Sequence, residues 1–216
     1  MKTAGQSLPA GLLHRGWWPR EAQETALSAV RQAVAKAPFF QPVMPRTGKP
    51  FSVRMTNFGT LGWVSDRDGG YRYQPVHPVI GRPWPPIPAP VLAVWWALSG
   101  YRHPPEACLV NLYRKGARMG LHQDRDEQDF DAPVVSISLG DDCRFRLGGT
   151  SRGGPTRAAR LSSGDVVVLG GESRLAFHGV DRIYAGTSDL LNGWLPEGGR
   201  INLTLRRVTP PPGSPP

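Results

Sequence analysis

The stretch Arg200-Ile201-Asn202-Leu203-Thr204-Leu205-Arg206 alternates without exception between polar and apolar side chains. In an extended strand, successive side chains point to opposite faces, so the polar residues share one face and the apolar residues the other. The apolar face requires a core to cover it. The stretch therefore predicts a β-strand whose apolar face contributes to a core and whose polar face lines a separate, polar space.

Short segments of similar character follow closely from residue 106 onward, with glycine-rich turns between them. Many short strands at such spacing favour a jelly roll or a sandwich over a parallel α/β sheet. The predicted fold class is therefore α+β and mainly β. The predicted strands are 51–57, 107–113, 133–139, 144–147, 165–169, 174–178 and 200–206.

Two helices are predicted before this region. Residues 19–37 carry Pro19 in the first turn and Glu21 near the positive end of the helix dipole, and Pro38 stops them. A second helix is predicted over 91–99. The apolar stripe of the first helix, which predicts docking on a larger body, is Ala26, Val30, Ala33 and Val34.

The chain of 216 residues is long enough for one domain with a buried core. We expect residues 1–18 to form an irregular arm and residues 19–207 to form the domain. Residues 208–216 are rich in proline, glycine and serine, and we expect a disordered tail there.

The net charge of +9 suits a polyanionic partner such as nucleic acid. The combined abundance of arginine, alanine, glycine and proline is also what a GC-rich genome produces, so the charge supports this partner only modestly. Cys108 and Cys143 are the only cysteines and cannot form a disulfide framework, which favours reduced thiols inside a cell. No apolar run approaches membrane-spanning length, and no secretory segment is recognisable at the N-terminus.

The segment 121–126 carries the strongest candidates for metal binding. If it is extended, His122 and Asp124 point the same way and offer two adjacent ligands. His178, which follows a strongly apolar run, is the natural third ligand. Two histidines and one carboxylate form the facial triad of non-haem Fe(II) oxygenases, which leaves coordination positions open. The alternative is a surface histidine beside acidic residues.

The polar face of 200–206 is the second candidate site. Arg200 and Arg206 are separated by about 20 Å of strand, yet their long arms can converge on an elongated dicarboxylate and pair with it bidentately. Asn111 and Tyr113 share one face of their own strand and offer neutral donors. A solvated edge strand is the alternative.

The long connection 58–82 is the third candidate. It carries Trp63, Tyr71 and Tyr73 among glycine, aspartate and arginine residues. Exposed aromatic side chains among basic residues suit stacking on nucleic-acid bases. Packing of the loop onto the domain explains the same residue types equally well.

Taken in order, these motifs resemble the AlkB family of Fe(II)/2-oxoglutarate-dependent nucleic-acid dealkylases. The resemblance extends from about Met55 to Arg206, so it covers most of the domain. The aromatic segment between Trp63 and Tyr71 is slightly longer than the family pattern, and the proline-rich tail is additional. The matching motifs are 55–57, 61–63, 108–113, 122–124, 170–174, His178 and the Arg200/Arg206 pair.

The resemblance implies a double-stranded β-helix (jelly roll) core and roles for residues in most of the motifs. It implies that Fe(II) is held by His122, Asp124 and His178. It implies that 2-oxoglutarate contacts Asn111, Tyr113, Arg200, Asn202 and Arg206. It implies that the substrate contacts Trp63, Tyr71, Tyr73, Asp126 and Arg152, with 51–82 acting as nucleotide-recognition loops. Asp126 would share a face with Asp124 if the strand continued.

The implied activity is oxidative demethylation of N-alkylated bases of the 1-methyladenine and 3-methylcytosine type, with release of formaldehyde. Oxygen and 2-oxoglutarate are the implied co-substrates, and 2-oxoglutarate would become succinate and CO2. The implied partner is single-stranded or flipped-out DNA, with RNA as a further candidate. We expect a bacterial, cytoplasmic monomer without a membrane partner.

Three other functions compete with this one. The same oxygenase core could act on a protein or a small molecule. A metal-binding jelly roll without redox chemistry would not need the Arg200/Arg206 pair. The third alternative is a basic nucleic-acid-binding protein in which the His-Asp-His pattern occurs by chance. The order of the motifs along the chain argues against it.

Overall fold

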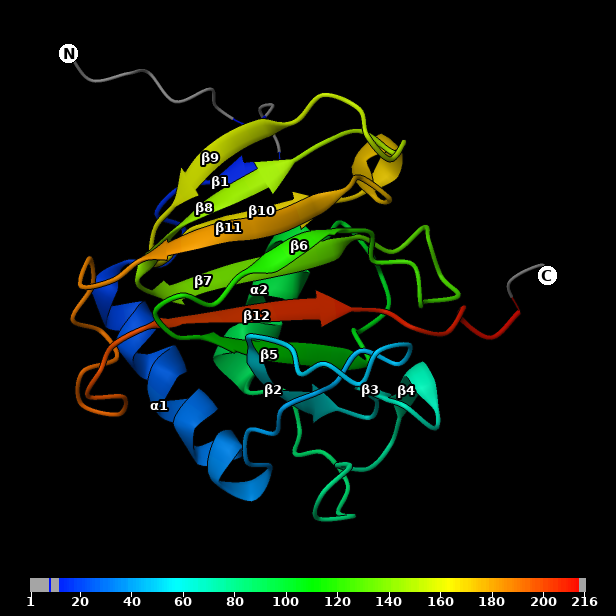
Figure 1. Ribbon diagram of the computed structural model, residues 1–216, viewed down its shortest axis with the longest axis horizontal. Coiled ribbons are helices and arrows are strands. Elements are labelled where there is room, and N and C mark those ends of the chain that lie inside the picture. The colour runs from blue at the N-terminus through cyan, green and yellow to red at the C-terminus, as the bar shows by residue number, and fades with distance from the viewer. Residues whose placement is uncertain (1–7, 9–11, 214–216) are drawn as a thin grey trace.

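The computed structural model describes residue 8 and residues 12–213 of the chain. Two β-sheets pack face to face, and two helices lie on one side of the larger sheet (Figure 1). The helices are α1 (Arg20–Lys36) and α2 (Ala89–Leu98), with a 3-10 turn at Gly171–Ser173. The strands are β1 (Leu13–His14), β2 (Arg54–Gly59), β3 (Gly62–Asp66), β4 (Gly70–Gln74), β5 (Ala107–Tyr113), β6 (Met119–His122), β7 (Val134–Gly140), β8 (Asp142–Leu147), β9 (Arg157–Leu161), β10 (Val166–Leu169), β11 (His178–Tyr184) and β12 (Arg200–Arg206).

The chain passes back and forth between the two sheets. The larger sheet has the order β1-β10-β7-β12-β5-β2 and the smaller has β6-β11-β8-β9, with every pairing antiparallel. From β5 to β12, successive segments therefore alternate between sheets, apart from the β8–β9 hairpin. This is the double-stranded β-helix, and the predicted fold class is confirmed.

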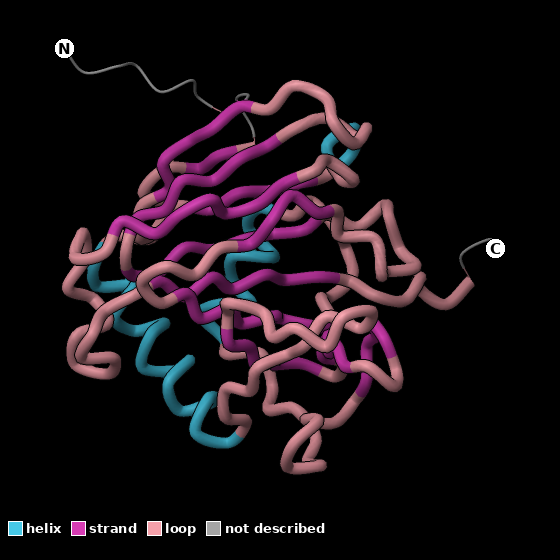
Figure 2. Tube along the Cα trace, viewed as in Figure 1, coloured by secondary structure: helices cyan, strands magenta, loops and turns pink. Residues whose placement is uncertain are grey.

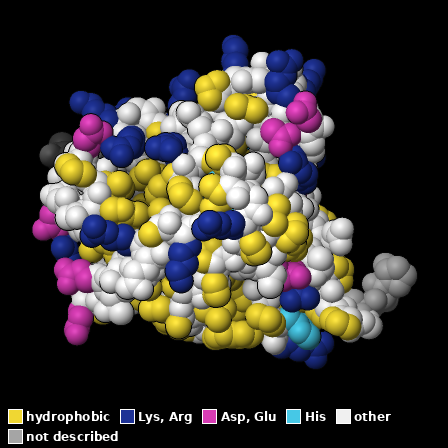
Figure 3. Space-filling view, turned by 90° about the horizontal axis from the view of Figure 1, so that it is seen from below, with side chains coloured by type: hydrophobic (Ala, Val, Ile, Leu, Met, Phe, Trp, Pro, Cys, Tyr) yellow, Lys and Arg dark blue, Asp and Glu magenta, His cyan; other side chains and the backbone are white. Residues whose placement is uncertain are grey.

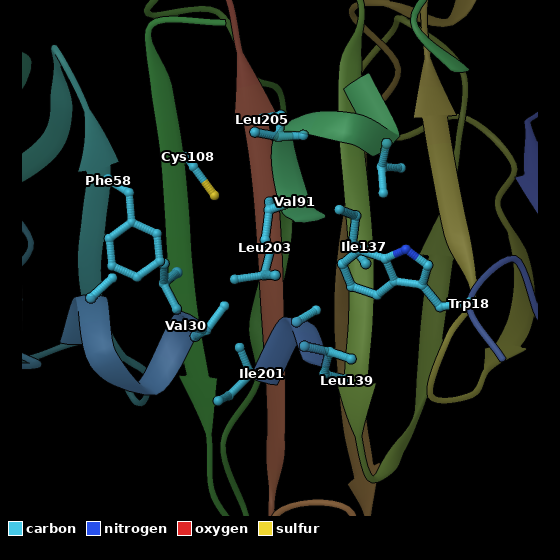
Figure 4. Packing of buried hydrophobic residues seen from close by; sticks show 14 of the residues in the cluster. Trp18, Val30, Phe58, Val91, Cys108, Ile137, Leu139, Ile201, Leu203 and Leu205 are labelled. Atoms are coloured by element: carbon cyan, nitrogen blue, oxygen red, sulfur yellow. The ribbon is translucent and has the colours of Figure 1, made fainter. Parts of the chain in front are cut away.

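The larger sheet is buried on both faces. Its outer face packs against α1 and α2 through residues such as Cys108, Ile137 and Leu203 (Figure 4). Its inner face packs against the smaller sheet through a second cluster that includes Leu109, Phe145 and Val167. Strand β5 is consequently buried along its whole length. Two cores of this kind hold the inner polar residues of β5 and β12 in fixed positions, because close-packed interiors resist displacement.

Helix α1 has the predicted extent to within a residue at each end. Its predicted stripe of Ala26, Val30, Ala33 and Val34 is buried, together with Gln23. Helix α2 carries Val91, Val94 and Trp95 into the same core. Both helices support the sheet that carries the polar face of β12.

Two sequence-based assignments of local structure are wrong. Residues 174–177 do not form a strand, because they follow the 3-10 turn and the Arg174 side chain is turned inward to bond to backbone carbonyls. Residues 58–82 are not only loop, because β3 and β4 pair as a hairpin (Figure 2). The segment 63–66 reads Trp-Val-Ser-Asp, which does not alternate between apolar and polar side chains and so did not indicate a strand. Strand β9, in which only residues 159–161 alternate between apolar and polar side chains, was not predicted, and neither was the part of β11 after His178.

The predicted arm and tail lie partly outside the described residues. Within the described part, Leu13 and His14 pair with β10, and Trp18 is buried in the outer core. At the other end, Val208 is buried and its backbone N–H bonds to Glu106, so the chain is anchored at the first residue of the predicted tail. No helix in the described part of the chain is long and apolar enough to cross a membrane.

Candidate functional site

Two histidines face each other across a pair of strands in the smaller sheet. His122 ends β6 and His178 begins β11, and the two residues are direct partners in the antiparallel register. Their ring centroids are 4.5 Å apart. Gly179 permits this approach, because a Cβ at that position would lie 2.6 Å from the carbonyl oxygen of Met119. The β6–β11 pairing thus unites two ligands that are 56 positions apart.

Asp124 completes the cluster from the turn after β6. The strand ends at His122, so Asp124 and Asp126 lie beyond it. Asp124 nevertheless lies beside both rings, with 3.6 Å from its Oδ1 to His122 Nε2 and 3.6 Å from its Oδ2 to His178 Nε2. The ligand atoms of the three residues all lie within 4.8 Å of one another. They form the His-Asp-His triad of a metal site.

The hydrogen bonds of the histidines fit a metal. Nδ1 of His122 bonds to the carbonyl oxygen of Gly120 at 2.9 Å, and Nδ1 of His178 bonds to that of Ala176 at 3.0 Å. A proton on each Nδ1 leaves each Nε2 as a lone-pair donor facing the cluster, which is the arrangement that ligating histidines adopt. Oδ2 of Asp124 is buried without a hydrogen-bond partner among the described residues. The three ligand atoms are therefore preset for a divalent cation.

Arg206 sets the charge of this cluster. Its Nη2 donates to Asp124 Oδ1 at 2.7 Å. Burial opposes ionisation of Asp124, but the guanidinium of Arg206 and the two histidines outweigh it, and the pKa of the carboxyl is lowered. Burial and the neighbouring His178 lower the pKa of His122, which favours the neutral, ligating imidazole. Both shifts favour the protonation states that metal binding requires.

An inner cavity extends from the triad between the two sheets. Arg200 is 1% exposed there and donates through Nη2 to Ser138 Oγ at 2.7 Å. Its Nε and Nη1 have no partner among the described residues, and the same is true of Nε of Arg206. Buried guanidinium donors without partners fit an anionic ligand, since an unpaired buried charge is costly. The predicted residues that line this cavity are Asn111, Tyr113, Arg200, Asn202 and Arg206.

An outer cavity also borders the triad, and the β3–β4 hairpin contributes to its wall. The rings of Trp63 and Tyr71 stack at its wall, with centroids 5.5 Å apart and planes 20° apart. Trp63 Nε1 donates to Asp126 Oδ2 at 2.8 Å. The residues that line both cavities are Asn111, Met119, His122, Asp124 and Arg206. The outer cavity therefore presents aromatic faces and a carboxylate directly beside the metal ligands.

Two predicted substrate residues lie elsewhere. Tyr73 and Arg152 are not among the described residues that line the outer cavity. The guanidinium of Arg152 lies over the ring of Phe177, 5.1 Å from its centroid. The Tyr73 hydroxyl is turned inward and bonds to Glu127 and to Arg206. The roles assigned to these two residues stay predictions.

The site also contains residues to which sequence reasoning gave no role. Glu127 and Arg174 are buried and paired beneath the triad. Met55 and Phe51 add apolar walls to the outer cavity. Glu127 follows Asp124 by three positions and could have been suspected as an acidic residue near a ligand. Arg174 belongs to the matching motif 170–174, but nothing in that motif indicated that its side chain is buried.

Comparison with known proteins agrees with this geometry. The chain matches the 2OG-Fe(II) oxygenase superfamily over residues 12–206. It is 55% identical over 195 residues to the alpha-ketoglutarate-dependent dioxygenase AlkB homolog of Caulobacter vibrioides, covering 88% of this chain and 86% of that protein. It is 39% identical over 207 residues to the alpha-ketoglutarate-dependent dioxygenase AlkB of Escherichia coli K12, covering 94% and 93%.

Among solved structures, OsALKBH1 superimposes with a TM-score of 0.72 at 30% identity, covering 94% of this chain and 100% of that one. The family match assigns the cofactor as Fe(II), with 2-oxoglutarate and O2 as co-substrates, and the triad and the free guanidinium donors fit them. The chain belongs to the 2OG-Fe(II) oxygenase superfamily and, within it, to the AlkB family of dioxygenases.

Proposed function

We propose that this dioxygenase removes methyl groups oxidatively from N-alkylated bases in DNA and RNA. The observation that carries the proposal is the outer cavity, where Trp63 and Tyr71 offer stacking faces beside the metal ligands. A base methylated on a ring nitrogen is flat and, for 1-methyladenine and 3-methylcytosine, cationic. Such a base gains from stacking on an indole through a cation–π contact and from a nearby carboxylate.

The inner cavity would hold 2-oxoglutarate. Arg200 is buried there, and its Nε and Nη1 have no partner within residues 12–213, so it is suited to a terminal carboxylate of the co-substrate. Arg206 is suited to the end nearer the triad, because it pairs with Asp124 and lines both cavities. When bound, Fe(II) and 2-oxoglutarate supply the oxidation of a C–H bond by O2, with 2-oxoglutarate converted to succinate and CO2.

The residues of the chain then position the reacting groups. Trp63 would hold the base flat against the cavity wall, and Asp126 would face its positive charge while fixing the indole. The methyl group would thereby be held at the boundary of the two cavities, next to His122 and Asp124. Hydroxylation of an N-methyl group gives a hemiaminal that releases formaldehyde and restores the base. Holding and shielding the reactants is the protein's own contribution.

The substrate must present the base outside a helical stack. The outer cavity lies between the β3–β4 hairpin and strands β2, β5 and β6, which supports a single-stranded or flipped-out base as the substrate. The net charge of +9 favours a polyanion, and Figure 3 shows Lys and Arg side chains spread over one face among hydrophobic ones. The buried thiols of Cys108 and Cys143, which form no disulfide, suit a reducing compartment and support a bacterial cytoplasmic location. We propose in addition that the enzyme acts as a monomer.

Formaldehyde release tests the proposal directly. We expect the protein to release formaldehyde from a single-stranded oligonucleotide that carries 1-methyladenine, only when Fe(II) and 2-oxoglutarate are both present. The unmethylated oligonucleotide is the matched control. Succinate formation stimulated by a methylated peptide or a small molecule, without formaldehyde from the oligonucleotide, would instead favour the same core acting on another substrate.

A further inference from the structure

Glu127 is a buried carboxylate with three charged or polar partners from three parts of the chain. It is 4% exposed. Its Oε2 pairs with Arg174 Nη2 at 3.2 Å, and its Oε1 pairs with Arg206 Nη1 at 3.0 Å. The Tyr73 hydroxyl donates to the same Oε1. Neither the triad nor the stacking of a base requires this carboxylate, so its partners need another explanation.

Its most consequential partner is Arg206. Nη2 of Arg206 bonds to Asp124, while Nη1 bonds to both Glu127 Oε1 and the Tyr73 hydroxyl oxygen, the latter also at 3.0 Å. A guanidinium is planar, so fixing two of its nitrogens fixes the direction of the third. That third nitrogen, Nε, has no hydrogen-bond partner in the part of the chain that the structure describes. Glu127 and Tyr73 therefore determine where the free donor of Arg206 points.

Arg174 holds Glu127 in turn. Its Nε donates to the Ala132 carbonyl oxygen at 2.8 Å and its Nη1 to the Asp124 carbonyl oxygen at 2.7 Å, and the side chain is almost fully buried. Asp124 and Glu127 carry two negative charges, which Arg174 and Arg206 balance with two positive ones. Removal of one carboxylate from such a cluster leaves a buried charge uncompensated. The cluster is thus one electrostatic unit beneath the triad.

Tyr73 connects this unit to the β3–β4 hairpin. Tyr71 and Tyr73 are two positions apart in β4, so they share a face of the hairpin. Tyr71 is 51% exposed and stacks on Trp63, whereas the Tyr73 hydroxyl reaches the buried carboxylate. The two tyrosines of one strand therefore have different surroundings: Tyr71 lines the outer cavity, whereas Tyr73 lines neither cavity and contacts Arg206, which lines both.

We propose that Glu127 is a positioning residue for Arg206 and that Tyr73 belongs, through its hydroxyl, to the 2-oxoglutarate site and not to the base site. The inference rests on the proposed function only in that Arg206 there contacts 2-oxoglutarate. It assigns Tyr73 a partner different from the one that the family resemblance implies. It also makes the hairpin a part of both sites, with Trp63 and Tyr71 facing the base and Tyr73 holding the co-substrate arginine.

Tyr73→Phe is the main test, because it removes one hydroxyl and no charge. The matched control is Tyr101→Phe, which removes a hydroxyl that donates to buried Asp129 at 2.7 Å, in a part of the fold that lines neither of the two cavities. Dissociation constants for 2-oxoglutarate and, separately, for the methylated oligonucleotide are measured on protein loaded with Mn(II). We expect Tyr73→Phe to weaken 2-oxoglutarate binding about tenfold, in line with loss of a hydrogen bond to a charged group. Oligonucleotide affinity should stay within about twofold of wild type, and Tyr101→Phe should change neither constant.

Glu127→Gln is the second variant. We expect it to raise the KM for 2-oxoglutarate more than it lowers kcat, and its effect should not add to that of Tyr73→Phe, because both act on Arg206. Asp165→Asn is its control, since Asp165 is equally buried and accepts two backbone N–H bonds near the start of β10. If Glu127→Gln does not fold, the Tyr73→Phe measurements decide alone.

Three results would overturn the inference. Tyr73→Phe could weaken the oligonucleotide and spare 2-oxoglutarate, which would return Tyr73 to the base site. It could leave both constants unchanged, or it could lower the melting temperature and both affinities in proportion, as general packing would. Because 2-oxoglutarate binding is measured without nucleic acid, a wild-type protein that fails to demethylate the oligonucleotide refutes the proposed function without affecting this comparison.

Discussion

The indole of Trp63 is tied to the carboxylate of Asp126 by a hydrogen bond of 2.8 Å from Nε1 to Oδ2. One residue belongs to the β3–β4 hairpin and the other to the segment that follows the metal ligand Asp124. The bond therefore fixes the plane of the ring relative to the metal site. An aromatic face on a surface hairpin is in this way held at a set position beside the reaction centre.

The first prediction concerns this ring. Trp63→Ala removes a stacking surface worth about 1–3 kcal/mol per base. We expect demethylation of a methylated oligonucleotide to fall about tenfold or more, while metal and 2-oxoglutarate binding stay nearly intact. Succinate formation in the absence of nucleic acid should continue.

Trp63→Phe separates the two roles of the indole, because it keeps an aromatic face and loses the bond to Asp126. It should retain more activity than Trp63→Ala. If Trp63 serves only to pack the hairpin, Trp63→Ala will instead lower the melting temperature and reduce both turnover rates in proportion.

Removal of either histidine ligand should abolish turnover. A facial site has three protein ligands and cannot lose one and keep its chemistry. Metal binding also stabilises the folded state by mass action, so Mn(II) should raise the melting temperature of the wild type and not that of His122→Ala or His178→Ala. The metal content of each variant measures binding, and melting curves with and without Mn(II) measure the stabilisation. Full activity in either variant would refute the triad.

Arg206→Lys should not behave as a conservative change. An ammonium group cannot reproduce the planar fork that contacts Asp124, Glu127 and Tyr73 together. We expect the dissociation constant for 2-oxoglutarate to rise about tenfold or more, equivalent to at least ~1.4 kcal/mol, with metal binding retained. Calorimetric titration with 2-oxoglutarate measures this dissociation constant. An unchanged dissociation constant in Arg206→Lys would mean that another residue contacts the co-substrate.

Gly179→Ala should weaken metal binding without altering a ligand. A Cβ at residue 179 would lie 2.6 Å from the Met119 carbonyl oxygen and 2.9 Å from that of Gly120, so β6 must move away from β11 and carry His122 away from His178. Gly120→Ala is the control in the facing strand, because its Cβ would have no neighbour within 4 Å. Comparison of the Mn(II) dissociation constants of the two variants decides whether the close approach of the strands sets the ligand geometry.

The metal-free protein should lose stability in acid through Asp124. The pKa of this carboxyl is lowered in the folded state by Arg206 and the histidines, against the opposing effect of burial. A group with a lowered pKa contributes stability that is complete above its unfolded value of about 3.9 and is lost as pH falls below it. We expect the free energy of unfolding in urea to drop between pH 5 and pH 3. Asp124→Asn should flatten this decline, and an equally steep decline in that variant would assign the effect to other carboxyls.

Much of the site could be predicted because it follows from alternation within single strands. The polar face of β12 was visible from the sequence, since a period of two places Arg200, Asn202 and Arg206 together wherever the strand lies. The His122/Asp124 pair was visible because ligands two positions apart stay close even though the strand ends between them. The order of motifs along the chain then predicted the family and the jelly roll.

The tertiary structure decided everything that depends on which strands pair. Register in the β6–β11 pair places His178 opposite His122, and no local pattern specifies that partner. The hydrogen-bond partner of the Tyr73 hydroxyl could likewise not be predicted from the sequence. Tyr71 and Tyr73 are the same residue type on the same strand, but Tyr71 is exposed and the Tyr73 hydroxyl reaches a buried carboxylate. Local sequence fixes which side chains share a face, since that is backbone geometry. Burial, partners and charge balance of a side chain such as Glu127 arise only when distant segments pack together.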